Sequence, residues 1–145
     1  MRKLLLLILC VAASACSSET APSNPGSLGS SLNISGNWTG VMSSSNNPAE
    51  TITMELTQAS GSVSGPWRGT VIAWSGQVSG TLSSGSFSGQ MTFTGLAVDG
   101  STCTGTASVT GSASSSTLSW TSGQGVVGAP CGAPMPAGVS VEMSR

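Results

Sequence analysis

Apolar and polar side chains alternate along most of the chain after residue 31. Around Ile52 the apolar residues alternate with Thr and Glu, and the same two-residue period recurs around Phe87, Cys103 and Val139. Such alternation is typical of antiparallel strands that have one buried face and one face in solvent. No window keeps the apolar spacing of an amphipathic helix. The pattern therefore predicts one all-β domain over residues 32–145.

This domain is expected to contain about eight or nine strands joined by turns rich in Gly and Ser. Uneven strand spacing argues against a solenoid, which would repeat at one fixed length. The sequential layout favours a small antiparallel up-and-down β-barrel, since closure removes the edges of strands that carry few charges. An open sandwich is the alternative. The predicted strands lie near residues 34–43, 50–58, 61–67, 69–74, 76–83, 86–94, 101–110, 116–121 and 137–144.

Glycine repeatedly occupies the apolar face, between two apolar residues of the same strand. This pattern is centred on Gly36, Gly65, Gly80, Gly89 and Gly105. A glycine in the middle of a strand normally weakens the sheet. In a narrow barrel, however, positions without a side chain permit strong bending and leave space for neighbouring Trp and Met residues. The recurrence therefore favours the barrel over the sandwich.

The beginning of the chain has the layout of an export signal. Arg2 and Lys3 precede an apolar run at 4–11, and small residues follow up to Cys16. A secretory signal peptide has this order of charge, apolar core and small residues, and the run is shorter than the roughly 20 residues of a membrane-spanning helix. Residues 1–15 are thus predicted to be a signal peptide. The Ser- and Pro-rich residues 16–31 are predicted to be a disordered tether.

Ala13-Ser14-Ala15-Cys16 resembles the lipobox of bacterial lipoproteins. In that family the Cys becomes the first residue of the mature chain and carries acyl chains such as palmitate. The family usually has Leu or Val where Ala13 stands, and an ordinary signal peptidase would also accept Ala13-x-Ala15. The resemblance implies a lipid anchor on Cys16. Ser17 after it implies delivery to the outer membrane of a two-membrane cell, with a secreted or periplasmic protein as the alternative.

Cleavage before Cys16 leaves that residue together with Cys103 and Cys131. If Cys16 carries lipid, the other two form a pair, whereas without lipid an exported chain has an unpaired thiol. Cys103 and Cys131 are predicted to form a structural disulfide. A redox or metal pair would need a CxxC spacing or further ligands.

Composition excludes several functions. The chain has no His, and 6% of its residues are charged. The absence of His rules out Ser-His-Asp and Cys-His catalysis as well as imidazole metal sites. After Lys3 the cationic side chains are Arg68 and Arg145, so a basic patch for nucleic acid is not expected.

The carboxylates also give no sign of catalysis. Acid–base work needs a buried or closely apposed pair whose pKa values differ. The alternation places Glu55 and Glu142 on solvent-facing sides of strands, Glu50 and Asp99 in loops, and Glu19 in the tether. We therefore expect no enzyme, no cofactor and no metal site; a calcium site at Asp99 would start from a single carboxylate.

Four tryptophans are the candidate ligand contacts. Three fall on the apolar face, and the fourth, Trp74, has an ambiguous position that suits the rim of a barrel. The simpler interpretation is that they fill the core. The alternative is that one or two line an open mouth and stack on a small apolar or saccharide ligand, with methionines making the interior adaptable. The residues are Trp38, Trp67, Trp74 and Trp120, with Met42, Met54, Met91 and Met143.

Gly36-Asn37-Trp38 resembles the Gly-x-Trp of lipocalins and the opening strand of avidin-like proteins, which are calycin-type barrels. In lipocalins a basic residue near the end of the last strand packs over this Trp. Arg145 follows the last predicted strand and matches that residue. The resemblance implies a small barrel and leaves the ligand open, because Tyr, frequent in biotin pockets, is absent.

Three functions are compatible with these features. The first is a lipid-anchored cell-envelope protein whose non-catalytic barrel binds a small apolar or saccharide ligand. The second is a protein–protein module, such as an inhibitor of an envelope hydrolase, with contacts in the loops at 43–49 and 123–136. The third is a passive structural lipoprotein of the surface, for which neutral walls rich in Ser and Thr suffice.

Overall fold

The computed structural model describes residues 32–45, 47–70, 73–97, 99–128, 131 and 137–145. The predicted signal peptide, Cys16 and the tether lie outside these residues, as does Glu19. Within the described part of the chain, no helix has the length and apolar character needed to cross a membrane.

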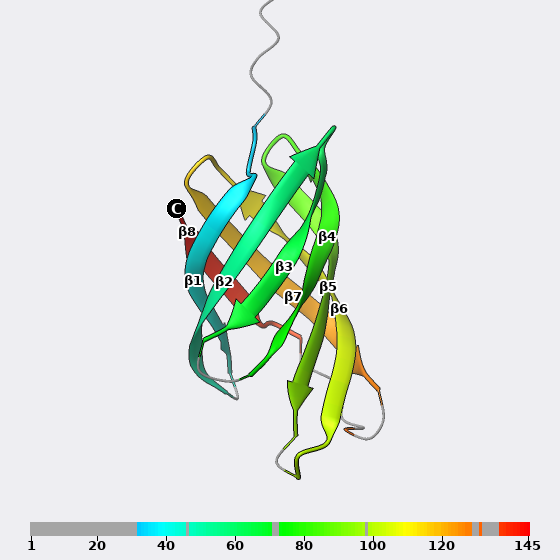
Figure 1. The fold of residues 1–145 in the computed structure, drawn as a ribbon. Coiled ribbons are helices and arrows are strands. Elements are labelled where there is room, and N and C mark those ends of the chain that lie inside the picture. The colour runs from blue at the N-terminus through cyan, green and yellow to red at the C-terminus, as the bar shows by residue number, and fades with distance from the viewer. Residues whose placement is uncertain (1–31, 46, 71–72, 98, 129–130, 132–136) are drawn as a thin grey trace, which may run out of the picture.

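Eight antiparallel strands close into one barrel, in which each strand pairs with its neighbours in sequence and β8 pairs with β1 (Figure 1). The predicted all-β up-and-down barrel is therefore confirmed, and the open sandwich is excluded. The strands are β1 (Gly36–Ser44), β2 (Asn47–Ala59), β3 (Ser62–Gly69), β4 (Ser75–Ser83), β5 (Ser86–Leu96), β6 (Thr102–Ala113), β7 (Thr117–Val127) and β8 (Ser140–Ser144).

One predicted strand, at 69–74, is wrong. The chain leaves β3 at Gly69 and joins β4 only at Ser75. The Gly69 amide donates a hydrogen bond to the Trp74 carbonyl at 2.8 Å, and the described residues Thr70, Ala73 and Trp74 belong to no strand. By contrast, β7 runs further than expected. A register shift between Ala107 and Val109 of β6 lets the second half of β7 stay paired with it.

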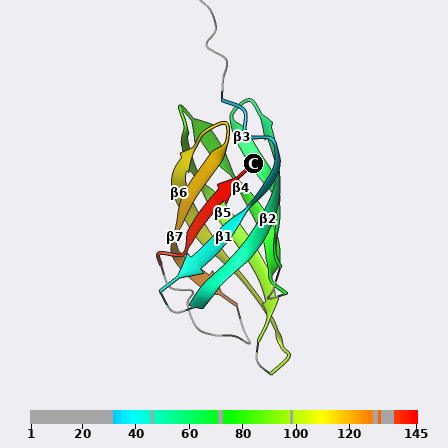
Figure 2. The same cartoon turned by 90° about the vertical axis from the view of Figure 1, so that its left-hand side faces the viewer.

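The two ends of the barrel differ in their connections. At one end, here called the turn end, Ser60-Gly61 and Ser84-Gly85 form two-residue turns, with φ of 49° at each Ser and 82° at each Gly. These values match the type I′ hairpin turn, in which Gly suits the second position. The connection at 114–116, residues 32–35 and the C-terminus are also at the turn end (Figure 2).

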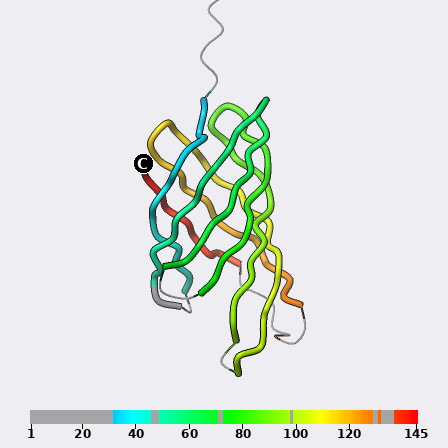
Figure 3. Tube along the Cα trace, in the orientation of Figure 1, coloured from blue at the N-terminus to red at the C-terminus, as the bar shows by residue number. Residues whose placement is uncertain are grey.

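The opposite end, here called the loop end, contains the connections that follow β1, β3, β5 and β7. Three of these are longer than the turns of the other end, and the connection from β7 to β8 spans 128–139. The hairpin of β5 and β6 extends furthest at this end (Figure 3). The loop end is therefore the more irregular of the two.

The interior is apolar and the outer wall is rich in Ser and Thr, as the alternation predicted. On β2, for example, Ile52, Met54 and Leu56 are buried, and Thr51, Thr53 and Glu55 between them are exposed. One continuous core connects all eight strands. Burial of these side chains supplies the main favourable free energy of folding.

Aromatic rings cover several inward-facing glycines. A Cβ atom on Gly80 would lie 2.7 Å from Phe87 Cζ, and one on Gly95 would lie 2.6 Å from the Trp74 ring. The rings thus occupy the space that side chains would take on neighbouring strands. Gly36 differs from the prediction. It is exposed rather than part of the apolar face, and its φ of +129° is one that residues with a side chain rarely adopt.

Candidate functional site

The turn end of the barrel is closed around Trp38. The guanidinium carbon of Arg145 lies 4.6 Å from the centre of the Trp38 ring. Arg145 also donates hydrogen bonds from Nε to the Ser115 carbonyl at 2.6 Å, from Nη1 to the Ser35 carbonyl at 2.6 Å and from Nη2 to the Asn33 carbonyl at 3.0 Å. The predicted packing of Arg145 over the tryptophan of Gly-x-Trp is confirmed.

Residues 32–35 complete this closure. Ile34 is fully buried, and its carbonyl accepts a hydrogen bond from Trp38 Nε1 at 2.9 Å. Gln58 of β2 fixes the segment, because its Oε1 accepts from the Ile34 amide and its Nε2 donates to the Leu32 carbonyl. A ligand that entered here would have to displace this apolar plug and its hydrogen bonds.

Three of the four candidate tryptophans belong to the core. Trp38, Trp67 and Trp120 are each exposed by 2% or less. Trp67 Nε1 donates to the Thr92 carbonyl at 2.9 Å, and Trp120 stacks on Phe87 with ring centroids 4.3 Å apart. The structure thus places these three where the core interpretation put them.

Trp120 has one unusual feature. Its Nε1 is buried and has no hydrogen-bond acceptor among the residues that the structure describes. Trp38 and Trp67, in contrast, both satisfy their indole N–H groups with carbonyl oxygens. Most buried polar groups in proteins have a partner, so an orphaned donor needs an explanation.

Trp74 lies at the loop end, in the connection between β3 and β4. Its ring is half-buried, covers Gly95 and stacks on Phe93 with centroids 5.6 Å apart and an angle of 18° between the ring planes. Of the four tryptophans it is the one with a partly exposed ring. This position agrees with the rim that the sequence predicted.

Glu50 is the main residue that the sequence pattern misplaced. It belongs to β2 rather than to a loop, and its side chain is only 5% exposed. The signal was present in the sequence, because Glu50 continues the inward series of Ile52, Met54 and Leu56 towards the start of the strand. A charged residue at the edge of an apolar series suggests the end of a strand, whereas the pairing of Glu50 with Met42 extends it.

Hydroxyl groups of three serines also lie towards the loop end. Ser43 Oγ and Ser140 Oγ lie within hydrogen-bond distance at 2.9 Å, which ties the end of β1 to the start of β8. Ser122 of β7 is buried, and its Oγ accepts a hydrogen bond from the Val139 amide at 3.2 Å. The loop end therefore combines polar side chains with the partly exposed ring of Trp74, unlike the turn end.

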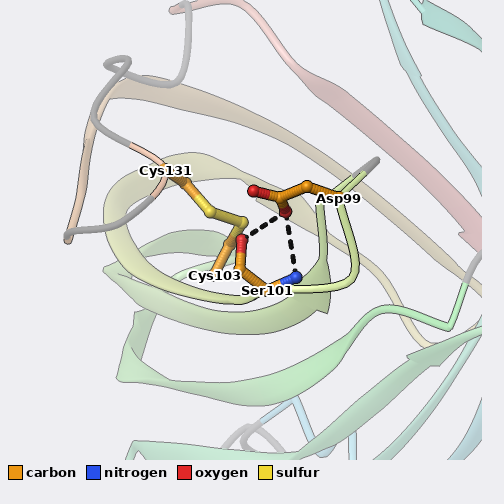
Figure 4. Close-up of a disulfide and its surroundings, with 4 residues drawn as sticks. All are labelled: Asp99, Ser101, Cys103 and Cys131. Atoms are coloured by element: carbon orange, nitrogen blue, oxygen red, sulfur yellow. Dashed lines mark hydrogen bonds between the residues drawn. A yellow bond between two sulfur atoms is a disulfide. The ribbon is translucent and has the colours of Figure 1, made fainter.

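The predicted disulfide is present between Cys103 and Cys131, whose Cα atoms are 5.6 Å apart (Figure 4). It fastens the connection between β7 and β8 to β6 at the loop end. Asp99 lies nearby in the connection between β5 and β6. Its Oδ1 accepts hydrogen bonds from Ser101 Oγ at 2.6 Å and from the Ser101 amide at 2.9 Å, which lower the pKa of this exposed carboxyl below its ordinary value of 3.8.

The described carboxylates are dispersed over the molecule. Glu55 is exposed on the outer wall, as predicted, and so is Glu142, whose Oε1 accepts a hydrogen bond from Ser119 Oγ at 2.6 Å. Glu50 faces the interior on the same strand as Glu55. Within the described ranges, no three residues of the types that ligate metals come together.

Comparison with known proteins places the chain in no family: no family model, no curated protein and no solved structure matches it. Its function therefore has to be inferred from the barrel itself.

Proposed function

We propose that this protein is a lipid-anchored protein of the cell envelope whose barrel binds a small apolar or saccharide ligand without catalysis. The observation that carries the proposal is the half-buried ring of Trp74, stacked on Phe93 at the loop end. A partly exposed aromatic face beside an apolar interior is a typical contact for both ligand classes.

The difference between the two ends supports binding at the loop end. At the turn end, Ile34 and the Arg145–Trp38 pair already occupy the opening. The loop end has longer connections, and the buried polar side chains of the barrel wall include Glu50 and Ser122. Ligand sites commonly combine apolar walls with a few placed polar groups in this way.

Titration of the purified full chain with N-phenyl-1-naphthylamine, a neutral apolar dye, and separately with methyl β-D-glucoside tests the proposal. Binding at the loop end should change the tryptophan emission, and Trp74→Ala should weaken binding at least tenfold. Val126→Ala is the matched control, since Val126 is 73% exposed on β7. If neither compound binds, or if Trp74→Ala binds as the wild type does, ligand binding at this end is refuted.

The lipid anchor is a separate part of the proposal and rests on the resemblance of Ala13-Ser14-Ala15-Cys16 to a lipobox. Attachment to the membrane would be stable if Cys16 carries more than one acyl chain. The intact mass of the mature protein, extracted from membranes, should show acyl groups on Cys16. A soluble chain with a free Cys16 thiol would instead support a secreted or periplasmic protein.

A protein–protein module is the second candidate. It is favoured by two exposed apolar side chains on the outer wall, Leu96 at the end of β5, which is 57% exposed, and Val126 near the end of β7. Exposed apolar side chains contribute to protein interfaces when a partner covers them. Under this function, Leu96→Ser and Val126→Ser should abolish capture of an envelope hydrolase and leave dye binding unchanged.

A further inference from the structure

Two polar groups lie inside the barrel on one row of paired residues. Glu50 of β2 pairs with Met42 of β1, Met42 pairs with Val141 of β8, and Val141 pairs with Trp120 of β7. All four side chains belong to the inward-facing set, and Glu50, Val141 and Trp120 are at least nine-tenths buried. The row thus has a carboxylate at one end, an indole N–H at the other and apolar side chains between them.

The carboxylate sets the first requirement for a ligand. Glu50 is the one charged side chain that is buried among the described residues. A carboxylate has about four acceptor positions, so Glu50 can receive a ligand's N–H groups in addition to its contacts within the chain.

The indole N–H adds the second requirement. Trp120 Nε1 is a buried donor without an acceptor among the described residues, although its ring is held firmly by stacking on Phe87. A donor left unsatisfied in an apolar interior is costly, and an acceptor atom on a bound molecule would remove that cost. Trp120 therefore points to a ligand independently of Glu50.

We propose that the barrel binds a small organic amine that also carries a hydrogen-bond acceptor, with its ammonium group on Glu50 and its acceptor on Trp120 Nε1. Met42 and Val141 would contact the apolar body between the two polar ends. This inference rests on the proposed ligand-binding function and narrows the ligand to an apolar body that carries an ammonium group at one end and a hydrogen-bond acceptor at the other. The aromatic pair of Trp74 and Phe93 at the loop end also suits a cation, because the faces of aromatic rings attract positive charge.

The ligand series that tests this inference differs in one group at a time. Tyramine has an ammonium and a phenol oxygen, phenethylamine lacks the oxygen, 4-ethylphenol lacks the amine, and 3-(4-hydroxyphenyl)propanoate replaces the amine by a carboxylate. Calorimetric titration of the full chain at neutral pH should give the tightest binding for tyramine. We expect binding at least tenfold weaker for 4-ethylphenol and none for the propanoate, because a second negative charge beside Glu50 is repelled.

Two variants connect the preference to its residues. Glu50→Gln keeps the shape of the side chain and removes its charge, so it should abolish the preference for tyramine over 4-ethylphenol. Glu55→Gln, on the outer face of the same strand, is the matched control and should keep it. Trp120→Phe should remove the preference for tyramine over phenethylamine, which wild type should show, and leave the preference for the amine intact.

Each outcome decides between the claims. Equal affinity of wild type for tyramine, 4-ethylphenol and the propanoate overturns the amine inference, while binding of the neutral dye in the same preparation leaves the proposed function standing. If neither the amines nor the dye bind, both fail. The ligand comparison uses wild-type protein, so it remains decisive even if Glu50→Gln or Trp120→Phe does not fold.

Discussion

Reduction of the Cys103–Cys131 disulfide is expected to cost a large part of the stability of this barrel. The two cysteines are separated by 28 residues in sequence. For a loop of that size, the loss of chain entropy in the unfolded state corresponds to a stabilisation of about 3.5 kcal/mol. Single domains have total stabilities of roughly 5–15 kcal/mol. The reduced protein should therefore remain folded at 25 °C with a much smaller margin.

Urea unfolding of the oxidised and the reduced wild-type protein, followed by tryptophan fluorescence, measures this difference directly. The comparison needs no substitution, so packing around the buried Cys103 is disturbed as little as possible. With the unfolding entropy usual for a domain of this size, the melting temperature should fall by about 15 °C. A difference below about 1 kcal/mol would refute the entropic argument. It would mean that the 103–131 segment is already restricted in the unfolded chain or that the bond strains the native state.

Three further predictions concern packing, the closed end and pH. Gly89→Ala should lower the unfolding free energy of the barrel by roughly 1–3 kcal/mol, because the added Cβ would lie 2.7 Å from Gly80 Cα and 2.9 Å from Phe87 Cζ. The control is Gly128→Ala, whose added Cβ would lie 3.6 Å from the Thr104 carbonyl oxygen. It should change the unfolding free energy by less than about 0.5 kcal/mol. Arg145→Ala should lower the unfolding free energy by about 2 kcal/mol through loss of its cation–π contact and hydrogen bonds. Arg145→Lys should recover less than half of this, since an ammonium cannot reproduce the hydrogen bonds of Nε, Nη1 and Nη2 together. Full recovery in Arg145→Lys would show that charge alone matters. In an NMR titration the Asp99 carboxyl should have a pKa below 3.8, because Ser101 donates hydrogen bonds to its charged form. The small contribution of Asp99 to stability is then present above the ordinary pKa and is lost as the pH falls through the lowered pKa. A titration midpoint at or above 3.8 would contradict the hydrogen bonds.

The amine inference and the proposed function depend on different residues, which keeps them separable. Dye binding depends on Trp74 at the loop end, whereas the preference for an amine depends on Glu50 on the inner wall. If the protein binds the dye but prefers the propanoate to tyramine, the proposed ligand-binding function stands and the amine inference fails. The comparison of Glu50→Gln with Glu55→Gln is informative because both substitutions remove one negative charge from β2, on opposite faces of the strand.

Much of the fold followed from the sequence because its determinants are local. The two-residue alternation along β2 and β6 reflects the pleat of a strand and identifies the buried face without knowledge of the partner strand. The glycines on that face predicted a strongly curved sheet, and cysteine parity paired Cys103 with Cys131. Gly36, Trp38 and Arg145 were brought together by resemblance, and the structure confirmed the contact of Arg145 with Trp38.

The tertiary structure decided the features that depend on contacts between distant strands. The apolar pattern at 69–74 does not reveal that β3 ends at Gly69, that β4 starts at Ser75 and that Gly69 bonds to the Trp74 carbonyl. Burial of Glu50 required the pairing of β2 with β1 to continue past the apolar series. The orphaned N–H of Trp120 appears only when the surrounding strands are in place, because hydrogen-bond satisfaction is a property of the packed interior and not of the residue. Sequence thus determined which face of each strand is buried, and closure of the barrel determined which polar groups were enclosed with it.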